Sequence, residues 1–165
     1  MTIKAIIFDL DGTLVSLPID YPALYAAFQK IMKIKNIEPL TKTVTALNDD
    51  LRRKVFETWT RAELAILPKV TIVKEGMELY QQYSRIPRAL VTMQGKETVE
   101  RILRTLNLSF QAVMTREDSL DRTAQIMLTL KKLRLEPKNV VVIGDRESDK
   151  FAAKKIGCKF KMVKT

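Results

Sequence analysis

The amino-acid sequence predicts an α/β fold, a Rossmann-like, doubly wound parallel sheet that carries a small helical unit. Three observations support this prediction. Short apolar runs, typical of strands buried on both faces of a sheet, occur at residues 3–8, 88–92 and 140–143. Helical patterns alternate with these later runs, as expected for a parallel sheet with helices on both faces. Residues 15–71, by contrast, show one helical pattern after another.

The first apolar run, Ile3–Phe8, is expected to be a strand, and a pair of acidic residues follows it. Asp9 and Asp11 point the same way because side chains alternate along an extended chain. Ligands bind at the carboxyl ends of strands in open α/β sheets, and hard carboxylate oxygens suit Mg²⁺. Gly12 permits a tight turn that brings backbone N–H groups close to an anion. A purely local Asx turn is the alternative interpretation.

Residues 15–71 are expected to be helical and to contain no strand. A first helix should begin near Asp20 and Pro22, which are typical of a helix start, and should end before Pro39. A second amphipathic stretch then continues to Pro68. Its apolar residues recur at helical spacing, at Val44, Leu47, Leu51, Val55, Trp59 and Ala62.

This helical segment predicts a unit inserted into the α/β fold. Connections between consecutive strands are usually short, so an excursion of this length is expected to form a unit of its own. The predicted organisation is a core made of residues 1–15 and 72–165 and a helical insertion at residues 16–71. Trp59 is expected to pack inside the insertion, with stacking on a substrate as the alternative role.

The residues after the insertion alternate between helical and extended patterns. One helix is expected to begin at Asp121, a good N-cap residue, and to stop before Pro137. The other expected elements are helices at residues 72–83, 96–106 and 148–156 and strands at residues 88–92, 110–115, 140–143 and 159–163.

The first motif, FDLDGTL at residues 8–14, resembles that of the haloacid dehalogenase-like (HAD) hydrolase superfamily. Members are mostly Mg²⁺-dependent phosphatases that form an aspartyl-phosphate. The resemblance implies that Asp9 is the nucleophile and Asp11 the general acid and base, with Gly12 and Thr13 near the substrate phosphate. These roles suit carboxylates, which can accept a phosphoryl group covalently or move a proton.

The strand at residues 88–92 resembles the second family motif, an apolar strand closed by Thr or Ser. The resemblance implies that the Thr92 hydroxyl binds a phosphate oxygen. Gln94 and Gly95 follow and open a helix, whose N–H groups are expected to complete the cradle. Alternatively, Thr92 serves as a turn or capping residue. The family often has Asn directly after this Thr, whereas this chain has Met93.

The sequence GDRESD at residues 144–149 resembles the fourth family motif and follows a predicted buried strand. The resemblance implies that Asp9, Asp145 and the Asp11 carbonyl hold Mg²⁺ and that Asp149 supports this metal site. Carboxylates at two strand ends can form such an oxygen-rich site. For Asp149, stabilisation of a helix N-terminus is the alternative role.

The third family motif supplies a lysine that neutralises the nucleophile and the phosphate. Residues 115–125 contain no lysine, and the next one is Lys131. Arg122 is the first substitute by position, and its forked donors match a phosphate. Arg116 is the second candidate. Either arginine could instead be an exposed cation near a helix end.

The composition excludes several classes of protein. The chain has 165 residues, a net charge of +10, no histidine and one cysteine, Cys158, so an intrachain disulfide and a zinc site of the Cys/His type are excluded. No apolar run approaches the ~20 residues of a membrane span, and no signal-peptide pattern opens the sequence, so a cytoplasmic protein is expected. Lys and Arg are dispersed and lack interleaved aromatic residues, which makes nucleic acid an unlikely partner.

Together these features predict a Mg²⁺-dependent phosphatase that hydrolyses a small phosphomonoester. The helical insertion after the first motif resembles the cap of the phosphoglycolate-phosphatase-like subgroup, and Tyr21, Arg52, Arg53 and Arg61 are its candidate specificity residues. Three alternatives remain, one of which is a phosphotransferase within the same enzyme class. A polynucleotide-end phosphatase would explain the basic composition, and a non-catalytic binding protein on the same scaffold would explain Met93 and the missing lysine.

Overall fold

The computed structural model of the chain describes residues 2–164. Parallel strands form a central five-stranded sheet in the order β5-β4-β1-β6-β7. The strands are β1 (Ala5–Phe8), β4 (Arg88–Val91), β5 (Ala112–Met114), β6 (Val140–Gly144) and β7 (Lys159–Met162). The predicted doubly wound parallel sheet is confirmed, and β1 lies at its centre.

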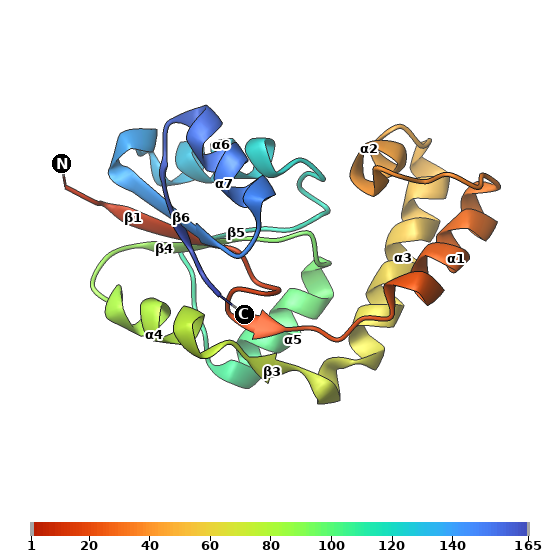
Figure 1. The fold of residues 1–165 in the computed structure, drawn as a ribbon, viewed down its shortest axis with the longest axis horizontal. Helices are drawn as coiled ribbons and strands as arrows, with labels where there is room; N and C mark the ends of the chain where they lie inside the picture. Colours follow the sequence, from red (N-terminus) through yellow and green to blue (C-terminus); the bar gives the residue numbers. More distant parts are fainter. Residues whose placement is uncertain (1, 165) are drawn as a thin grey trace.

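Helices cover both faces of this sheet. The pair α4 (Lys74–Gln82) and α5 (Lys96–Leu106) lies on one face, and α6 (Arg122–Leu133) and α7 (Glu147–Ile156) lie on the other (Figure 1). The chain proceeds from β1 through β4 to one edge of the sheet and from β6 to the opposite edge. The carboxyl ends of β1 and β6 therefore flank the point where the strand order reverses, which is where ligands bind in such sheets.

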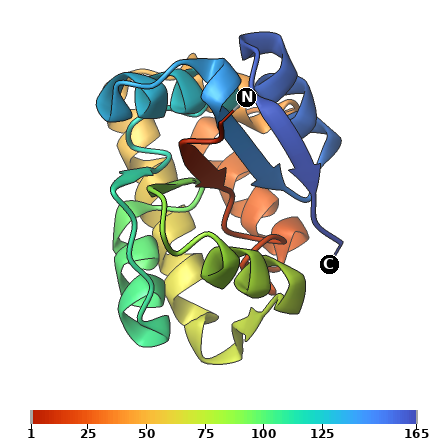
Figure 2. The ribbon, with the colours of Figure 1, turned by 90° about the vertical axis from the view of Figure 1, so that its left-hand side faces the viewer.

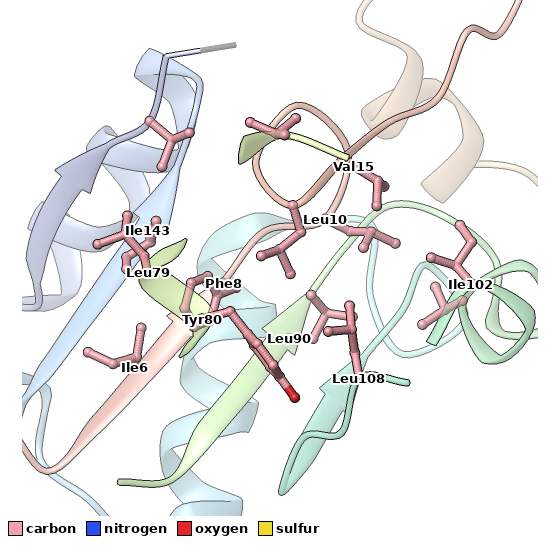
Figure 3. Close-up of a cluster of buried hydrophobic side chains, with 14 of the residues drawn as sticks. Ile6, Phe8, Leu10, Val15, Leu79, Tyr80, Leu90, Ile102, Leu108 and Ile143 are labelled. Carbon is pink, nitrogen blue, oxygen red and sulfur yellow. The ribbon is translucent and has the colours of Figure 1, made fainter. Parts of the chain in front are cut away.

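Side chains of β1 alternate between two apolar cores. Ile6 and Phe8 pack in the core under α4 and α5, whereas Ala5 and Ile7 pack in the core under α6 and α7. Figure 3 shows Phe8 beside Tyr80 of α4 in the first of these cores, and their ring centroids lie 6.1 Å apart. Burial on both faces explains why β1 reads as an uninterrupted apolar run.

A short antiparallel ribbon lies at the two ends of the predicted insertion, where no strand was predicted. It pairs β2 (Val15–Ser16) with β3 (Thr71–Ile72). The expectation of no strand at residues 15–71 was therefore wrong, and the helix expected at residues 72–83 begins only at Lys74. Strands of two residues are too short to show a period, and their pairing depends on contacts distant in sequence.

The inserted residues form α1 (Tyr21–Met32), α2 (Leu40–Thr45) and α3 (Asp49–Ala65). In Figure 1 these helices lie beyond the carboxyl end of β1, and Figure 2 shows them behind the sheet. The second amphipathic stretch is two helices rather than one, because Asn48 accepts a hydrogen bond from the Leu51 N–H and starts α3. The division into a core and an insertion stays a prediction.

The helices of the insertion share an apolar cluster. Trp59 is buried there and meets Phe28 edge to face at 5.5 Å, as expected for a packing residue. Asp121 caps α6 as predicted, since its carboxylate accepts the Ala124 N–H. The remaining elements are the 3₁₀ helices η1 (Leu67–Lys69) and η2 (Pro137–Asn139). No helix within residues 2–164 is long and apolar enough to cross a membrane.

Candidate active site

Three carboxylates meet at the carboxyl ends of β1 and β6. Asp9, Asp145 and Asp149 each offer an oxygen, and these oxygens lie within 4.8 Å of one another. The register of the sheet explains this proximity, because Phe8 pairs with Ile143 and the Asp9 N–H donates to the Ile143 carbonyl at 3.0 Å. The structure thus brings together three of the four predicted metal-binding aspartates.

The turn after β1 holds Asp145 in place. Gly12 has a φ of +82°, and a Cβ atom added there would overlap the Asp145 carboxylate, so this close approach requires glycine. The Thr13 hydroxyl donates to Asp145 Oδ1 at 3.3 Å. Helix α4 supports the turn from behind, since a Cβ added at Gly76 would overlap the Thr13 carbonyl oxygen. Gly12 and Thr13 therefore lie at the predicted site and orient one of its acids.

Arg122 bridges two of the three carboxylates. Its Nη2 lies 3.1 Å from Asp9 Oδ1, and its Nε lies 3.0 Å from Asp149 Oδ1. Asp149 also accepts the Arg146 N–H at 3.3 Å, so it caps α7 as well as facing the acidic cluster. The structure places Arg122 where the sequence analysis expected a cation, at the first turn of α6 and beside Asp9.

Gln125, which was not among the predicted site residues, orients Arg122. The Gln125 Oε1 accepts from Arg122 Nη1 at 2.7 Å, while its fully buried amide donates to the Thr92 carbonyl at 2.8 Å. The same amide lies within hydrogen-bonding distance of the carbonyl oxygens of Thr115 and Ser119. The available signal was a polar residue on the buried face of α6, one turn after Arg122.

Thr92 ends β4 beside β1, but its surroundings differ from the predicted cradle. Its hydroxyl donates to the Gln94 side chain and accepts the Gln94 N–H at 3.2 Å. The first N–H groups of α5 meet protein carboxylates: Gly95 donates to Glu63, and Lys96 donates to Glu117. The expectation that these helix N–H groups receive phosphate was therefore wrong, because acidic side chains occupy them.

Arg116 does not reach the acidic cluster. Its side chain is fully buried and pairs with Glu63 of α3, with Arg116 Nη1 2.9 Å from Glu63 Oε2. The prediction of Arg116 as a second phosphate cation was wrong, and so was the alternative of an exposed cation. A partner in the inserted helices decided its position, and nothing in the local sequence indicated that partner.

Asp11 lies next to the cluster, and its carboxylate accepts the Leu17 N–H at 3.0 Å. Burial raises the pKa of Asp11. Burial, together with the Asp11 carboxylate, raises the pKa of Tyr21 at the start of α1 to about 12. Among the cap residues singled out from sequence, Tyr21 therefore interacts electrostatically with the Asp11 carboxylate.

Arg52, Arg53 and Arg61, the three cap arginines, line a different cleft. This cleft has a volume of about 850 Å³, lies between α3 and α5, and includes none of the three clustered aspartates among its lining residues. Arg52 and Arg53 pair with the neighbouring Asp49 and Asp50 on the surface of α3. Arg53 lies on an exposed helix face, whereas Arg52 also donates to the carbonyls of Thr45 and Leu47 at the end of α2.

The electrostatics of the cluster favour a bound cation. Burial raises the pKa of Asp9 from 3.8 to about 7, the Arg122 guanidinium opposes the shift, and the Asp149 carboxylate adds to it. A further positive charge would therefore keep Asp9 ionised at neutral pH. Carboxylate oxygens are the ligands that Mg²⁺ prefers, so Asp9, Asp145 and Asp149 fit this ion.

Comparison with solved structures supports the fold. A hydrolase from Pseudomonas syringae aligns with a TM-score of 0.72 at 20% identity, over 95% of this chain and 83% of that one. A haloacid dehalogenase-like family hydrolase from Streptococcus pneumoniae aligns with a TM-score of 0.69 at 21% identity, over 96% of this chain and 83% of that one. CbbY from Rhodobacter sphaeroides, solved in complex with phosphate, aligns with a TM-score of 0.69 at 18% identity, over 96% of this chain and 85% of that one.

Comparison of sequences identifies the family. A phosphoglycolate phosphatase from Aquifex aeolicus (strain VF5) is 26% identical over 178 residues, which cover 94% of this chain and 82% of that protein. Residues 26–163 match the family described as haloacid dehalogenase-like hydrolase. This match begins after the motif at residues 8–14, so the motif and the match are separate observations. The chain therefore belongs to the haloacid dehalogenase-like hydrolase family, as its first motif predicted, and is an enzyme of that family.

Proposed function

We propose that this hydrolase is a Mg²⁺-dependent phosphatase that cleaves a small phosphomonoester through an aspartyl-phosphate on Asp9. The observation that carries the proposal is the position of Arg122, which bridges Asp9 and Asp149 beside Asp145. A guanidinium beside a nucleophilic carboxylate can neutralise an incoming phosphate dianion. The similarity to a phosphatase from Aquifex aeolicus supports the same reaction class.

Asp9 and Asp11 divide the chemistry between them. The Asp9 carboxylate attacks phosphorus in line, the bond from phosphorus to the substrate oxygen breaks, and Asp11 gives its proton to the departing alkoxide. In the second step Asp11 takes a proton from water, and this water displaces Asp9 from phosphorus to release inorganic phosphate. The raised pKa of Asp11, caused by burial, supports its role as the initial acid.

The carboxylates of Asp9, Asp145 and Asp149 would hold Mg²⁺, together with the backbone carbonyl of Asp11. A bound Mg²⁺ supplies positive charge that stabilises the transferring phosphoryl group and lowers the pKa of its ligands. Arg122 and the Thr92 hydroxyl would bind the remaining phosphate oxygens. For Thr92 this requires that its hydroxyl turn from Gln94 toward the substrate.

The test is a phosphate-release assay on purified protein with Mg²⁺ or with a chelator. The panel should include phosphoglycolate, sugar phosphates, nucleotides and oligonucleotides phosphorylated at either end. We expect Mg²⁺-dependent turnover of small phosphomonoesters and an acid-stable phosphorylated protein that Asp9→Asn does not form. Faster hydrolysis of oligonucleotide ends would favour the polynucleotide alternative, and failure on every substrate would favour a non-catalytic protein.

A further inference from the structure

Among residues 2–164, Arg116 has the largest fully buried side chain, and it forms an ion pair with a fully buried glutamate. Both side chains of the Glu63–Arg116 pair have zero exposure, and two parallel contacts of 2.9 Å join the guanidinium to the carboxylate. The partners are 53 residues apart. Glu63 lies in α3 of the insertion, and Arg116 follows β5 of the sheet, so this pair connects the two parts of the molecule.

Both partners of the pair also bind the segment that follows Thr92, while Arg116 Nη2 donates to the Thr60 hydroxyl of α3 at 2.6 Å. Arg116 Nη1 donates to the Met93 carbonyl at 3.1 Å. Glu63 Oε1 accepts the Gly95 N–H at 3.1 Å and the Thr98 hydroxyl at 2.9 Å. Residues on both sides of Gln94 are therefore bound directly to one or the other partner of the ion pair.

Tight packing leaves this loop little room to move. A Cβ added at Gly95 would lie 2.7 Å from Arg116 Nη2 and 2.7 Å from the Thr60 hydroxyl, so only glycine fits there without a shift. The guanidinium also packs on the Trp59 ring, because the Arg116 Cζ lies 4.4 Å from the ring centroid. A displacement of α3 would therefore displace the loop.

Stability alone is a weak reason for such a pair. Removing two charges from water costs free energy, and apolar side chains of similar volume often serve a buried position equally well or better. A guanidinium–carboxylate pair does fix the relative orientation of its two side chains, because its two parallel hydrogen bonds form in one geometry only. The network around this pair specifies where Met93 and Gly95 lie, and Thr92 directly precedes Met93.

We propose that Glu63 and Arg116 are positioning residues that hold the Thr92 loop in its phosphate-binding geometry, so that helix α3 helps to set the active site. The inference rests on the proposed phosphate contact of Thr92. A second support for the same loop comes from α6, where the Gln125 side chain binds the Thr92 carbonyl and Arg122. The ion pair and Gln125 together bind the backbone from the Thr92 carbonyl to the Gly95 N–H.

The decisive variant is Glu63→Leu/Arg116→Met, which replaces the ion pair by apolar side chains and leaves no unpaired buried charge. We expect it to fold with a lower Tm than the wild type, because the Gly95 N–H, the Thr98 hydroxyl and the Met93 carbonyl lose their partners. We also expect amide hydrogen exchange at residues 93–98 to become at least about tenfold faster, because local opening then costs less free energy. Unchanged exchange at these amides would overturn the proposal, whether or not the protein is a phosphatase.

Activity provides a second, independent measurement. If the pair acts through Thr92, the double variant should have a kcat/KM about tenfold or more below that of the wild type. The same two substitutions made in Thr92→Val should lower kcat/KM less than about threefold, because losses that act through one shared contact do not add. Fully additive losses would overturn the positioning role. Absence of turnover in the wild type would refute the proposed function and leave the exchange experiment as the test of positioning.

Two further variants complete the experiment. Lys74→Gln/Glu78→Gln removes an exposed ion pair of 3.8 Å on helix α4 and should change neither exchange at residues 93–98 nor kcat/KM. Arg116→Lys keeps the positive charge and loses the paired guanidinium contacts. This variant provides the same test of positioning if the double variant fails to fold. A folded Arg116→Lys protein with wild-type exchange and kcat/KM would count against the proposal.

Discussion

The Nη2 atom of Arg122 lies 3.1 Å from the Asp9 carboxylate, although 113 residues of sequence separate the two side chains. The same guanidinium reaches Asp149 through its Nε, and both contacts use the fixed fork of arginine. One cation thus lies between two of the three clustered acids. Its loss would leave Asp9 and Asp149 to repel each other in a buried place.

The first prediction concerns Arg122. Arg122→Ala should lower kcat/KM by about 10- to 100-fold, since a charge-assisted contact is commonly worth about 1.5–3 kcal/mol. It should also lower the free energy of unfolding at pH 8, because the Arg122 side chain is only 14% exposed and pairs with two carboxylates. Steady-state kinetics and denaturant unfolding test both effects.

Two variants control for this measurement. Arg122→Lys should recover part of the activity, because it keeps the charge and loses the fork. Arg101→Ala removes an exposed arginine from α5 and should leave kcat/KM unchanged. Wild-type turnover in Arg122→Ala would show that the phosphate is neutralised elsewhere.

The second prediction is a pH dependence of stability in the metal-free protein. The folded state raises the pKa of Asp9 from 3.8 to about 7, mainly by burial, so the folded state binds this proton more tightly than the unfolded state. The contribution of this proton to the free energy of unfolding is fully present below pH 4. It is lost as the pH rises to about 7, and the loss amounts to up to about 4 kcal/mol. Mg²⁺ should restore stability above pH 7, which thermal unfolding with and without the ion measures.

The third prediction concerns Asp9 itself. Asp9→Asn should abolish turnover, because an amide is a poor nucleophile, and should also raise the Tm of the metal-free protein at pH 8 by removing a buried charge. It should flatten the pH dependence described above and reduce the stabilisation by Mg²⁺. Retained activity in this variant would refute the aspartyl-phosphate mechanism, and a lower Tm would refute the account of its pKa.

The fourth prediction compares two glycines. Gly12 and Gly157 both have positive φ, at +82° and +105°, so an Ala at either position strains the backbone by about 1 kcal/mol. Only Gly12→Ala would also displace the Asp145 carboxylate, whereas a Cβ at Gly157 lies 3.6 Å from Pro137. Calorimetric titration should show weaker Mg²⁺ binding in Gly12→Ala alone. Equal affinity in the two variants would remove Asp145 from the metal site.

The fifth prediction concerns the net charge of +10. Because Lys and Arg are dispersed, oligonucleotide binding at physiological salt should be weak, with a Kd above about 10⁻⁶ M that rises steeply with salt. Fluorescence anisotropy across a salt series measures this. Tight and saturable binding that persists at high salt would favour the polynucleotide alternative.

Local sequence was sufficient to predict the sheet and the acidic residues at its strand ends. The runs that became β1 and β6 are apolar throughout because both faces of these strands are buried, and this pattern is visible without any partner. The turn at Gly12 and the cap at Asp121 also depend on residues a few positions away. Such features follow from backbone geometry and side-chain periodicity, which a single segment carries.

Only the tertiary structure could distinguish Arg122 from Arg116. Both are arginines near the start of α6, yet one faces Asp9 and the other lies buried against Glu63. The ribbon of β2 and β3 and the role of Gln125 escaped prediction for the same reason. A charged or amide side chain is placed by the partner that compensates for its burial. Here the carboxylates that pair with Arg122 lie 113 and 27 residues away, and the one that pairs with Arg116 lies 53 residues away.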